Sequence, residues 1–383
     1  MISLPEPPYA LEPLRAQVPL LDRFTPMNHC SQAPQSLRTR AAGLAYLDGW
    51  DERGMDWDAW MAEVEAARTA FARLVGAAPG DVAVGSSVSQ LVSSLATALP
   101  FTGPRTRVLA STGEFPTVTH AWKAQARRGA VVELVSTRAG TVDVGEFVER
   151  LDERVQVVSI SHGLYESGFV MDVEAIQAAA ARVGALTVVD AYQTLGTRPV
   201  DVHALGVDVL VGGCLKYLMG VPGLAFMYVR PEVAIGLQPG ITGWFGRSHP
   251  FAFDSTLDWA EGARRFELGT PPIFEAHVCR AGIEWISEVG PAAIYTWTSV
   301  LSDALIEGGR AQGLKLHGTG QSRDKSPSTA FRVNDAAALE QALRGRGVLA
   351  SARGPVLRLA PHFYSTLEDV ERSLIALQGV RPR

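Results

Sequence analysis

Cysteine is scarce in this chain. Its 383 residues include three cysteines, Cys30, Cys214 and Cys279, which are far apart and odd in number. Domains that depend on disulfides carry many more cysteines, and zinc sites need them in closely spaced pairs. The sequence therefore predicts neither a disulfide framework nor a bound metal.

Long apolar runs and an excess of positive charge are also missing. No run approaches the roughly 20 apolar residues that a membrane helix needs. The opening residues, MISLPEPPYALEPLRAQ, lack the basic segment and apolar core of a secretory signal. Lysine and arginine number 35 against 40 aspartates and glutamates, so nucleic acid is not expected as the main partner. We expect a cytoplasmic protein that has no membrane partner.

Short β-rich runs alternate with helical patterns through the middle of the chain. The runs include DVAVGSS, RVLAST, VVELVS, VQVVSISH, ALTVVDAY and VDVLVGG. Helical segments of roughly ten to fifteen residues between such runs predict an α/β fold with a mainly parallel sheet. We expect three parts: a proline-rich N-terminal arm at 1–40, a large domain at 41–265 and a smaller C-terminal α+β domain at 266–383.

Two of these runs lead into a single charged residue. Asp190 follows LTVV, and Lys216 comes shortly after VDVLVGGC. Because ligands bind outside the carboxyl ends of the strands in an open α/β sheet, we expect both side chains at one edge. A buried carboxylate is costly without a cation, and burial lowers the pKa of a lysine so that a nucleophilic neutral amine becomes available. The two residues either pair with each other or hold a cofactor.

A cofactor explains more of the neighbouring residues. Pyridoxal phosphate (PLP) needs a lysine for its Schiff base, an acid for its ring nitrogen, an anion site for its phosphate and a flat partner for its ring. Ser87 and Ser89 lie in GSSVSQ, between a strand and a helix start, which suits either phosphate binding or a plain helix cap. Phe115, in STGEFPTVTH, either stacks on the ring or belongs to the core.

Longer stretches carry a resemblance to a known family. They are ARLVGAAPGDVAVGSSVS, GEFPTV, SHGLYESG, DAYQTLGTRPVDVHALGVDVLVGGCLKYLMGVPG, GWFGRSHPFAF and RRFELGTPPI. Together they resemble the fold-type I PLP-dependent enzymes of the class V aminotransferase group, with kynureninase first and the cysteine desulfurases and C–S lyases next. The resemblance covers residues 45–275 best. It implies a large PLP-binding domain with a seven-stranded, mainly parallel sheet, an amino-acid substrate, and a homodimer with shared active sites.

The same resemblance implies roles for individual residues. Lys216 would form the Schiff base with PLP and move the substrate proton, and Asp190 would pair with the ring nitrogen. The other cofactor contacts would be Val88 and Ser89 at the phosphate, Phe115 and Gln193 at the ring, and Trp244 and Thr270 from a neighbouring subunit. The substrate would be held by Arg358 at its carboxylate, with Tyr165 and Trp50 nearby.

The chain also departs from these relatives. Leu215 stands where kynureninases have tyrosine, and Gln193 where they usually have histidine. Met55 replaces a common tryptophan, and no cysteine follows Cys279 to serve persulfide transfer as in the desulfurases. The predicted reaction is cleavage at Cβ of an amino acid, of the kynureninase or C–S lyase type. Transamination, epimerisation, and a PLP-binding protein without catalytic activity are the alternatives.

Overall fold

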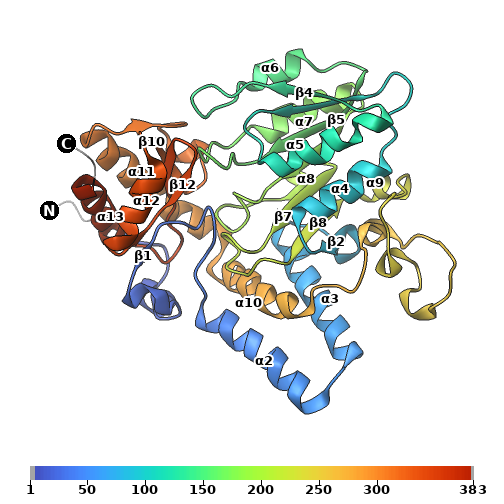
Figure 1. Cartoon of the computed structure of the whole chain (residues 1–383), viewed down its shortest axis with the longest axis horizontal. Coiled ribbons are helices and arrows are strands. Elements are labelled where there is room, and N and C mark those ends of the chain that lie inside the picture. The colour runs from blue at the N-terminus through green and yellow to red at the C-terminus, as the bar shows by residue number, and fades with distance from the viewer. Residues whose placement is uncertain (1–4, 381–383) are drawn as a thin grey trace.

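The centre of the molecule is a seven-stranded sheet in which one strand runs against the other six. A computed structural model describes residues 5–380 (Figure 1). The strand order is β2-β8-β7-β6-β5-β3-β4, and β8 is antiparallel to both of its neighbours. The strands are β2 (Val82–Gly85), β3 (Arg107–Ser111), β4 (Val131–Val135), β5 (Val155–Ser161), β6 (Leu186–Asp190), β7 (Val209–Gly213) and β8 (Ala225–Val229). The predicted mainly parallel α/β sheet is confirmed.

Helices cover both faces of this sheet because successive strand residues point to opposite sides. In β8, Phe226 and Tyr228 belong to the core cluster that contains residues of α3, α7 and α10, whereas Ala225 and Met227 pack with residues of α4 and α5. The helices around the sheet are α3 (Trp57–Leu74), α4 (Val88–Ala98), α5 (Pro116–Lys123), α6 (Val144–Glu149), α7 (Val173–Arg182), α8 (Val202–Leu205), α9 (Pro231–Ile235) and α10 (Ile273–Val289).

The C-terminal part has its own antiparallel sheet and its own apolar core. Its strand order is β12-β13-β10-β9, and helices α11, α12 and α13 contribute to the same core cluster. The elements are α11 (Pro291–Ala311), β9 (Lys315–Leu316), β10 (Thr329–Arg332), α12 (Ala336–Gly345), β11 (Val348–Leu349), β12 (Ser351–Arg353), β13 (Val356–Leu359) and α13 (Leu367–Val380). The expected smaller α+β unit is therefore present, while its exact boundaries stay a prediction.

The N-terminal segment lies against this C-terminal part (Figure 1). After α1 (Leu11–Arg15), strand β1 (Thr25–Pro26) pairs in parallel with β11. The Tyr9 hydroxyl donates to the Phe363 carbonyl at 2.8 Å. The chain then enters α2 (Leu37–Arg53), which packs against α10, and α10 in turn packs against α3. Residues 27–36 thus run between the two sheets.

Within residues 5–380, no helix is both long and apolar enough to cross a membrane. The same part of the chain contains no group of three or more His, Cys, Asp or Glu side chains arranged to hold a metal ion. The cytoplasmic location stays a prediction.

Candidate active site

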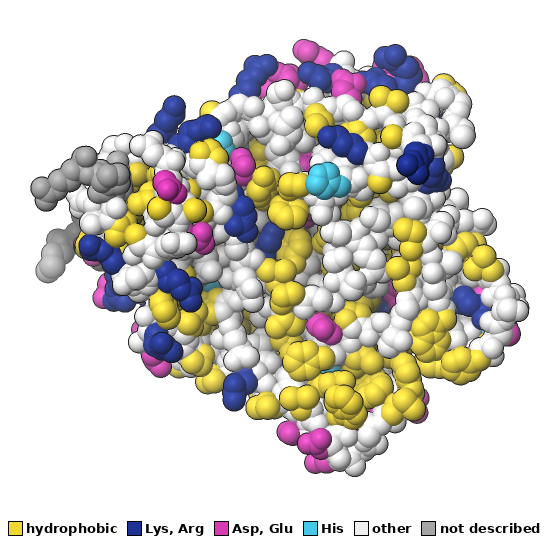
Figure 2. Space-filling view, in the orientation of Figure 1, with side chains coloured by type: hydrophobic (Ala, Val, Ile, Leu, Met, Phe, Trp, Pro, Cys, Tyr) yellow, Lys and Arg dark blue, Asp and Glu magenta, His cyan; other side chains and the backbone are white. Residues whose placement is uncertain are grey.

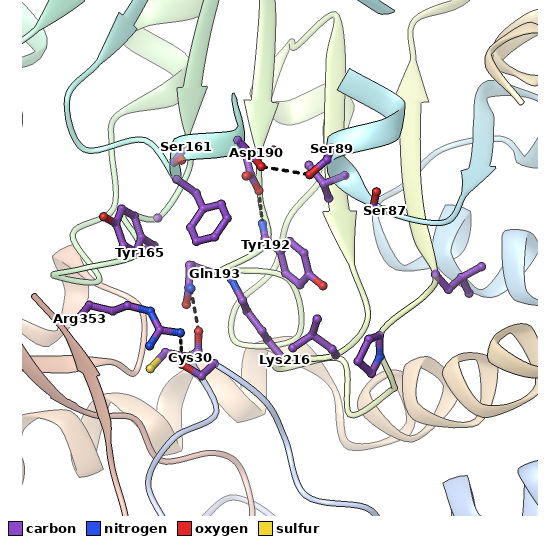
Figure 3. A pocket seen from close by; sticks show the side chains of 18 of the residues that line it. Cys30, Ser87, Ser89, Ser161, Tyr165, Asp190, Tyr192, Gln193, Lys216 and Arg353 are labelled. Carbon is purple, nitrogen blue, oxygen red and sulfur yellow. Dashed lines mark hydrogen bonds between the residues drawn. The ribbon is translucent and has the colours of Figure 1, made fainter. Parts of the chain in front are cut away.

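A cavity of about 340 Å³ opens where the parallel strands of the large sheet end (Figure 3). Its size falls within the range of small-molecule sites. Three parts of the chain form the wall. They are Cys30 and Ser31 from the N-terminal segment, Asp190 at the end of β6 with Lys216 after β7, and Arg353 and Arg358 from the C-terminal sheet.

Lys216 reaches the cavity from the turn after β7. Its Nζ lies 4.2 Å from the ring centroid of Tyr192 and 5.8 Å from that of Phe115. The Tyr192 ring packs so closely on β7 that a Cβ atom on Gly213 would come within 2.3 Å of its hydroxyl, which explains the glycine there. Burial lowers the pKa of Lys216 to about 8, although the Asp190 charge works in the opposite direction.

Asp190 ends β6 on the opposite side of the cavity (Figure 3). Its Oδ1 accepts a hydrogen bond from the Tyr192 N–H at 2.9 Å. Burial raises the pKa of Asp190, while that hydrogen bond and the Lys216 charge lower it. Within residues 5–380, Asp190 and Lys216 do not form an ion pair, because no nitrogen–oxygen distance between them is 4.0 Å or less. The simple structural ion pair is therefore not formed, and the cavity lies between the two charges.

The N-terminus of α4 forms another part of the wall. The Ser87 side chain accepts from the Gln90 N–H at 3.2 Å, so Ser87 is the helix cap. The N–H groups of Val88 and Ser89, one and two positions further on, have no partner inside the helix. Both residues line the cavity. The cap and the anion site are therefore compatible, because the cap satisfies one N–H and leaves others for a ligand.

Aromatic and amide side chains also line the cavity. Phe115 lines the cavity with 44% of its surface uncovered and meets the Tyr165 ring edge-on at 5.4 Å. The Gln193 Nε2 donates to the Cys30 carbonyl at 3.0 Å, but its buried Oε1 finds no hydrogen-bond partner within residues 5–380.

These groups fit PLP. Asp190 is a buried carboxylate whose charge one backbone hydrogen bond compensates only in part. The Gln193 side chain, the uncovered Phe115 ring and the first N–H groups of α4 surround the same space. Leu215, which stands where kynureninases have tyrosine, lines the cavity as an apolar side chain.

Arg358 is buried at the end of the cavity near the C-terminal sheet. Its Nη1 donates to the Tyr165 carbonyl at 2.5 Å, and its Nη2 donates to the hydroxyls of Ser31 at 2.9 Å and Ser351 at 2.7 Å. Its Nε is buried and has no hydrogen-bond partner in the described chain. A hydrogen bond with His317 and, to a smaller extent, the Arg358 charge lower the pKa of Glu166, yet the described ion pairs do not join Arg358 and Glu166. A protein carboxylate therefore does not explain this arginine.

Three predicted residues do not line the cavity of this single chain. Trp244 packs against Trp57 and Phe251, with ring centroids 5.9 and 5.5 Å away. Trp50 lies on α2 and is 54% exposed, and Thr270 lies in the loop before α10. Their predicted roles, including the contact of Trp244 and Thr270 from a neighbouring subunit, stay predictions.

The cavity also contains residues to which the sequence had given no role. Ser31, Ser161, Tyr192 and Arg353 all line it. Tyr192 could have been found, because it follows Asp190 by two positions at the same strand end. Arg353 precedes a Gly-Pro pair, which marks a turn but says nothing of what the arginine meets.

Comparisons with known proteins identify the family of this chain. The family model described as aminotransferase class-V matches residues 54–371. An "uncharacterized aminotransferase YcbU" of Bacillus subtilis is 32% identical over 95% of this chain and 96% of its own length. A kynureninase of Pseudomonas fluorescens is 28% identical over 94% of this chain and 90% of its own.

Solved structures share the fold at lower sequence identity. An apo cysteine desulfurase of Thermococcus onnurineus superposes with a TM-score of 0.88, at 21% identity and 99% coverage of both chains. The cystine C–S lyase C-DES, in complex with cysteine persulfide, gives a TM-score of 0.86 at 20% identity, covering 96% of this chain and all of its own. With a family model that matches most of its length, the chain belongs to the class-V aminotransferase family.

Proposed function

We propose that this protein is a PLP-dependent enzyme that acts on an amino acid and holds its cofactor through Lys216. The observation that carries the proposal is the arrangement of a lysine amine and a buried aspartate across one cavity, with a helix N-terminus in the same wall. Bound PLP would supply an electron sink for negative charge at the substrate Cα.

Different residues of the chain would bind different parts of PLP. The Asp190 carboxylate would hold the proton on the ring nitrogen, and the N–H groups at Val88 and Ser89 would bind the phosphate. Phe115 would cover the ring, and the second N–H of the Gln193 amide would donate to the ring oxygen. With a pKa of about 8, the Lys216 Nζ both takes up and releases a proton near neutral pH.

For the reaction we propose cleavage at Cβ of the amino acid, of the kynureninase or C–S lyase type. Two observations support cleavage at Cβ. The sequence is similar to a kynureninase along nearly the whole chain, and the fold is similar to that of a cystine C–S lyase. Transamination is the second candidate, favoured by the Bacillus subtilis relative, whose name is that of an aminotransferase. Fold alone does not decide between them.

We also propose that the enzyme works as a homodimer. Hydrophobic side chains gather over the lower part of the face drawn in Figure 2. Exposed apolar residues include Trp50, Met55 and Phe253, which are 54%, 69% and 78% exposed. Apolar surface that is exposed in this way is typical of a protein interface. A partner here would also explain why Trp244 and Thr270 lie outside the cavity of their own chain.

The test begins with the cofactor. Borohydride reduction of the purified protein should fix PLP on Lys216, and peptide mapping should find the label there. Lys216→Ala should lose the label, whereas Lys123→Ala, which changes an exposed lysine of α5, should keep it. A label on another lysine, or none, would refute the proposal.

A panel of amino acids with product analysis then separates the two reactions. Pyruvate or alanine as a product indicates cleavage at Cβ. A keto acid formed only when an acceptor is consumed indicates transamination. Sedimentation of the same holoprotein tests the homodimer, and a monomer at assay concentration would contradict that part.

A further inference from the structure

Two arginines of the C-terminal sheet converge on one oxygen atom. Ser31 Oγ accepts from Arg358 Nη2 at 2.9 Å and from Arg353 Nη2 at 3.2 Å. The same oxygen lies 2.6 Å from the Ser351 hydroxyl. Arg353 and Arg358 sit on β12 and β13, which are adjacent strands. Both guanidinium groups line the cavity that holds Lys216.

Neither guanidinium group is neutralised by an acid. The ion pairs formed within residues 5–380 include no carboxylate partner for Arg353 or Arg358. Arg353 Nη1 donates a hydrogen bond to the Ala352 carbonyl at 2.7 Å. Both arginines line the same cavity as Lys216, so both charges face it. Two like charges around one neutral hydroxyl repel each other, and an anion at that point would relieve the repulsion.

We propose that Arg353 is a second carboxylate-binding residue, so that the substrate carboxylate lies between Arg353 and Arg358 near the position of the Ser31 hydroxyl. The assignment rests on the proposed amino-acid substrate. One anion, not two, is indicated because both guanidinium groups point to the same oxygen. A carboxylate has enough lone pairs to accept from both arginines at once.

The two arginines differ in burial, and this sets their expected effects. Arg358 is 1% exposed and is fixed by three hydrogen bonds, whereas Arg353 is exposed at the rim. A contact to the carboxylate is made equally before and during the reaction, so its loss raises KM and leaves kcat nearly unchanged. Arg353→Gln should therefore raise KM about 2- to 5-fold, the range for a charged pair at an exposed position.

The experiment compares Arg353→Gln and Arg353→Lys with a matched control, Arg332→Gln. Arg332 is an exposed arginine of β10 in the same sheet, and it does not line the cavity. KM and kcat are measured with the best amino acid of the panel and with its amide. The KM increase should appear with the acid, be smaller in Arg353→Lys, and be absent from the amide and from Arg332→Gln. An equal effect on acid and amide, or an unchanged KM, would overturn the assignment.

A second readout needs no turnover. Propionate, propionamide and succinate are titrated into each holoprotein by calorimetry. Propionate should bind to the unmodified protein and bind more weakly to Arg353→Gln, whereas propionamide should bind to neither. If only succinate binding depends on Arg353, the residue binds the second carboxylate of a substrate, and the single-anion assignment is wrong. If propionate behaves as expected but no amino acid reacts, the anion site stands and the proposed function fails.

Discussion

The lowered pKa of Lys216 predicts how the rate at which PLP would attach to this lysine depends on pH. Covalent attachment needs the neutral amine, and burial lowers the pKa of Lys216 to about 8. The neutral fraction then rises about tenfold between about pH 7 and pH 9 and levels off above, whereas for an ordinary lysine it rises about a hundredfold with no plateau. The attachment rate of protein stripped of its cofactor should follow the tenfold curve.

The rate is measured by following PLP absorbance after rapid mixing, at each pH. Nα-acetyl-lysine, measured in parallel, corrects for the titration of PLP itself. Lys325 provides an internal control, because burial lowers its pKa to about 7 but it does not line the cavity. Borohydride trapping should label Lys216 and not Lys325. A rate that keeps rising in proportion to hydroxide above about pH 9 would refute a lowered pKa at Lys216.

Three further outcomes are expected. In Asp190→Asn, the pH dependence of the PLP attachment rate should shift to lower pH, because the Asp190 charge raises the pKa of Lys216. The turnover rate of the same variant should fall about 100-fold or more. Normal turnover would remove Asp190 from the mechanism. Glu267→Gln should lower the free energy of unfolding by on the order of 3 kcal/mol in urea titrations, because it leaves Arg68, 1% exposed, without its buried acid. An unchanged free energy of unfolding would show that this ion pair does not stabilise the fold. Burial lowers the pKa of His29 from 6.5 to about 4, so the folded state binds fewer protons in that window and stability should fall as pH drops through it. His29→Gln should reduce this slope, and an unaltered slope would assign the acid sensitivity to other groups.

Local sequence patterns predict much of this fold, because strand ends are local features. The apolar run before Asp190 and the one before Lys216 each end where the chain must turn, so both charges fall at the same edge of the sheet. The direction of β8 is different. Its residues, AFMYV, are buried on both faces and would suit either direction equally. Only its pairing with β2 and β7 shows that it is reversed.

The substrate end of the cavity could not be predicted in the same way. Ser31 and Arg353 are 322 positions apart in the sequence, and no periodicity links them. The residues near Arg353 indicate a turn, and those near Ser31 indicate an irregular arm. Their meeting depends on how the two sheets are docked, which is a property of the whole chain.

That docking makes the N-terminal segment a part of the site rather than an appendage. Its backbone is tied to both sides of the cavity: the Ala33 N–H donates to the Leu215 carbonyl beside Lys216 at 2.9 Å, and His29 Nδ1 lies 2.7 Å from the Ala360 carbonyl beyond β13. Ser31 lies between these two attachments and meets both arginines. The lysine that would hold the cofactor and the arginines that would hold the carboxylate are therefore positioned through the same short stretch of chain. A displaced arm would alter the distance between the two ends of the proposed site, because a different sheet would hold each end of the substrate.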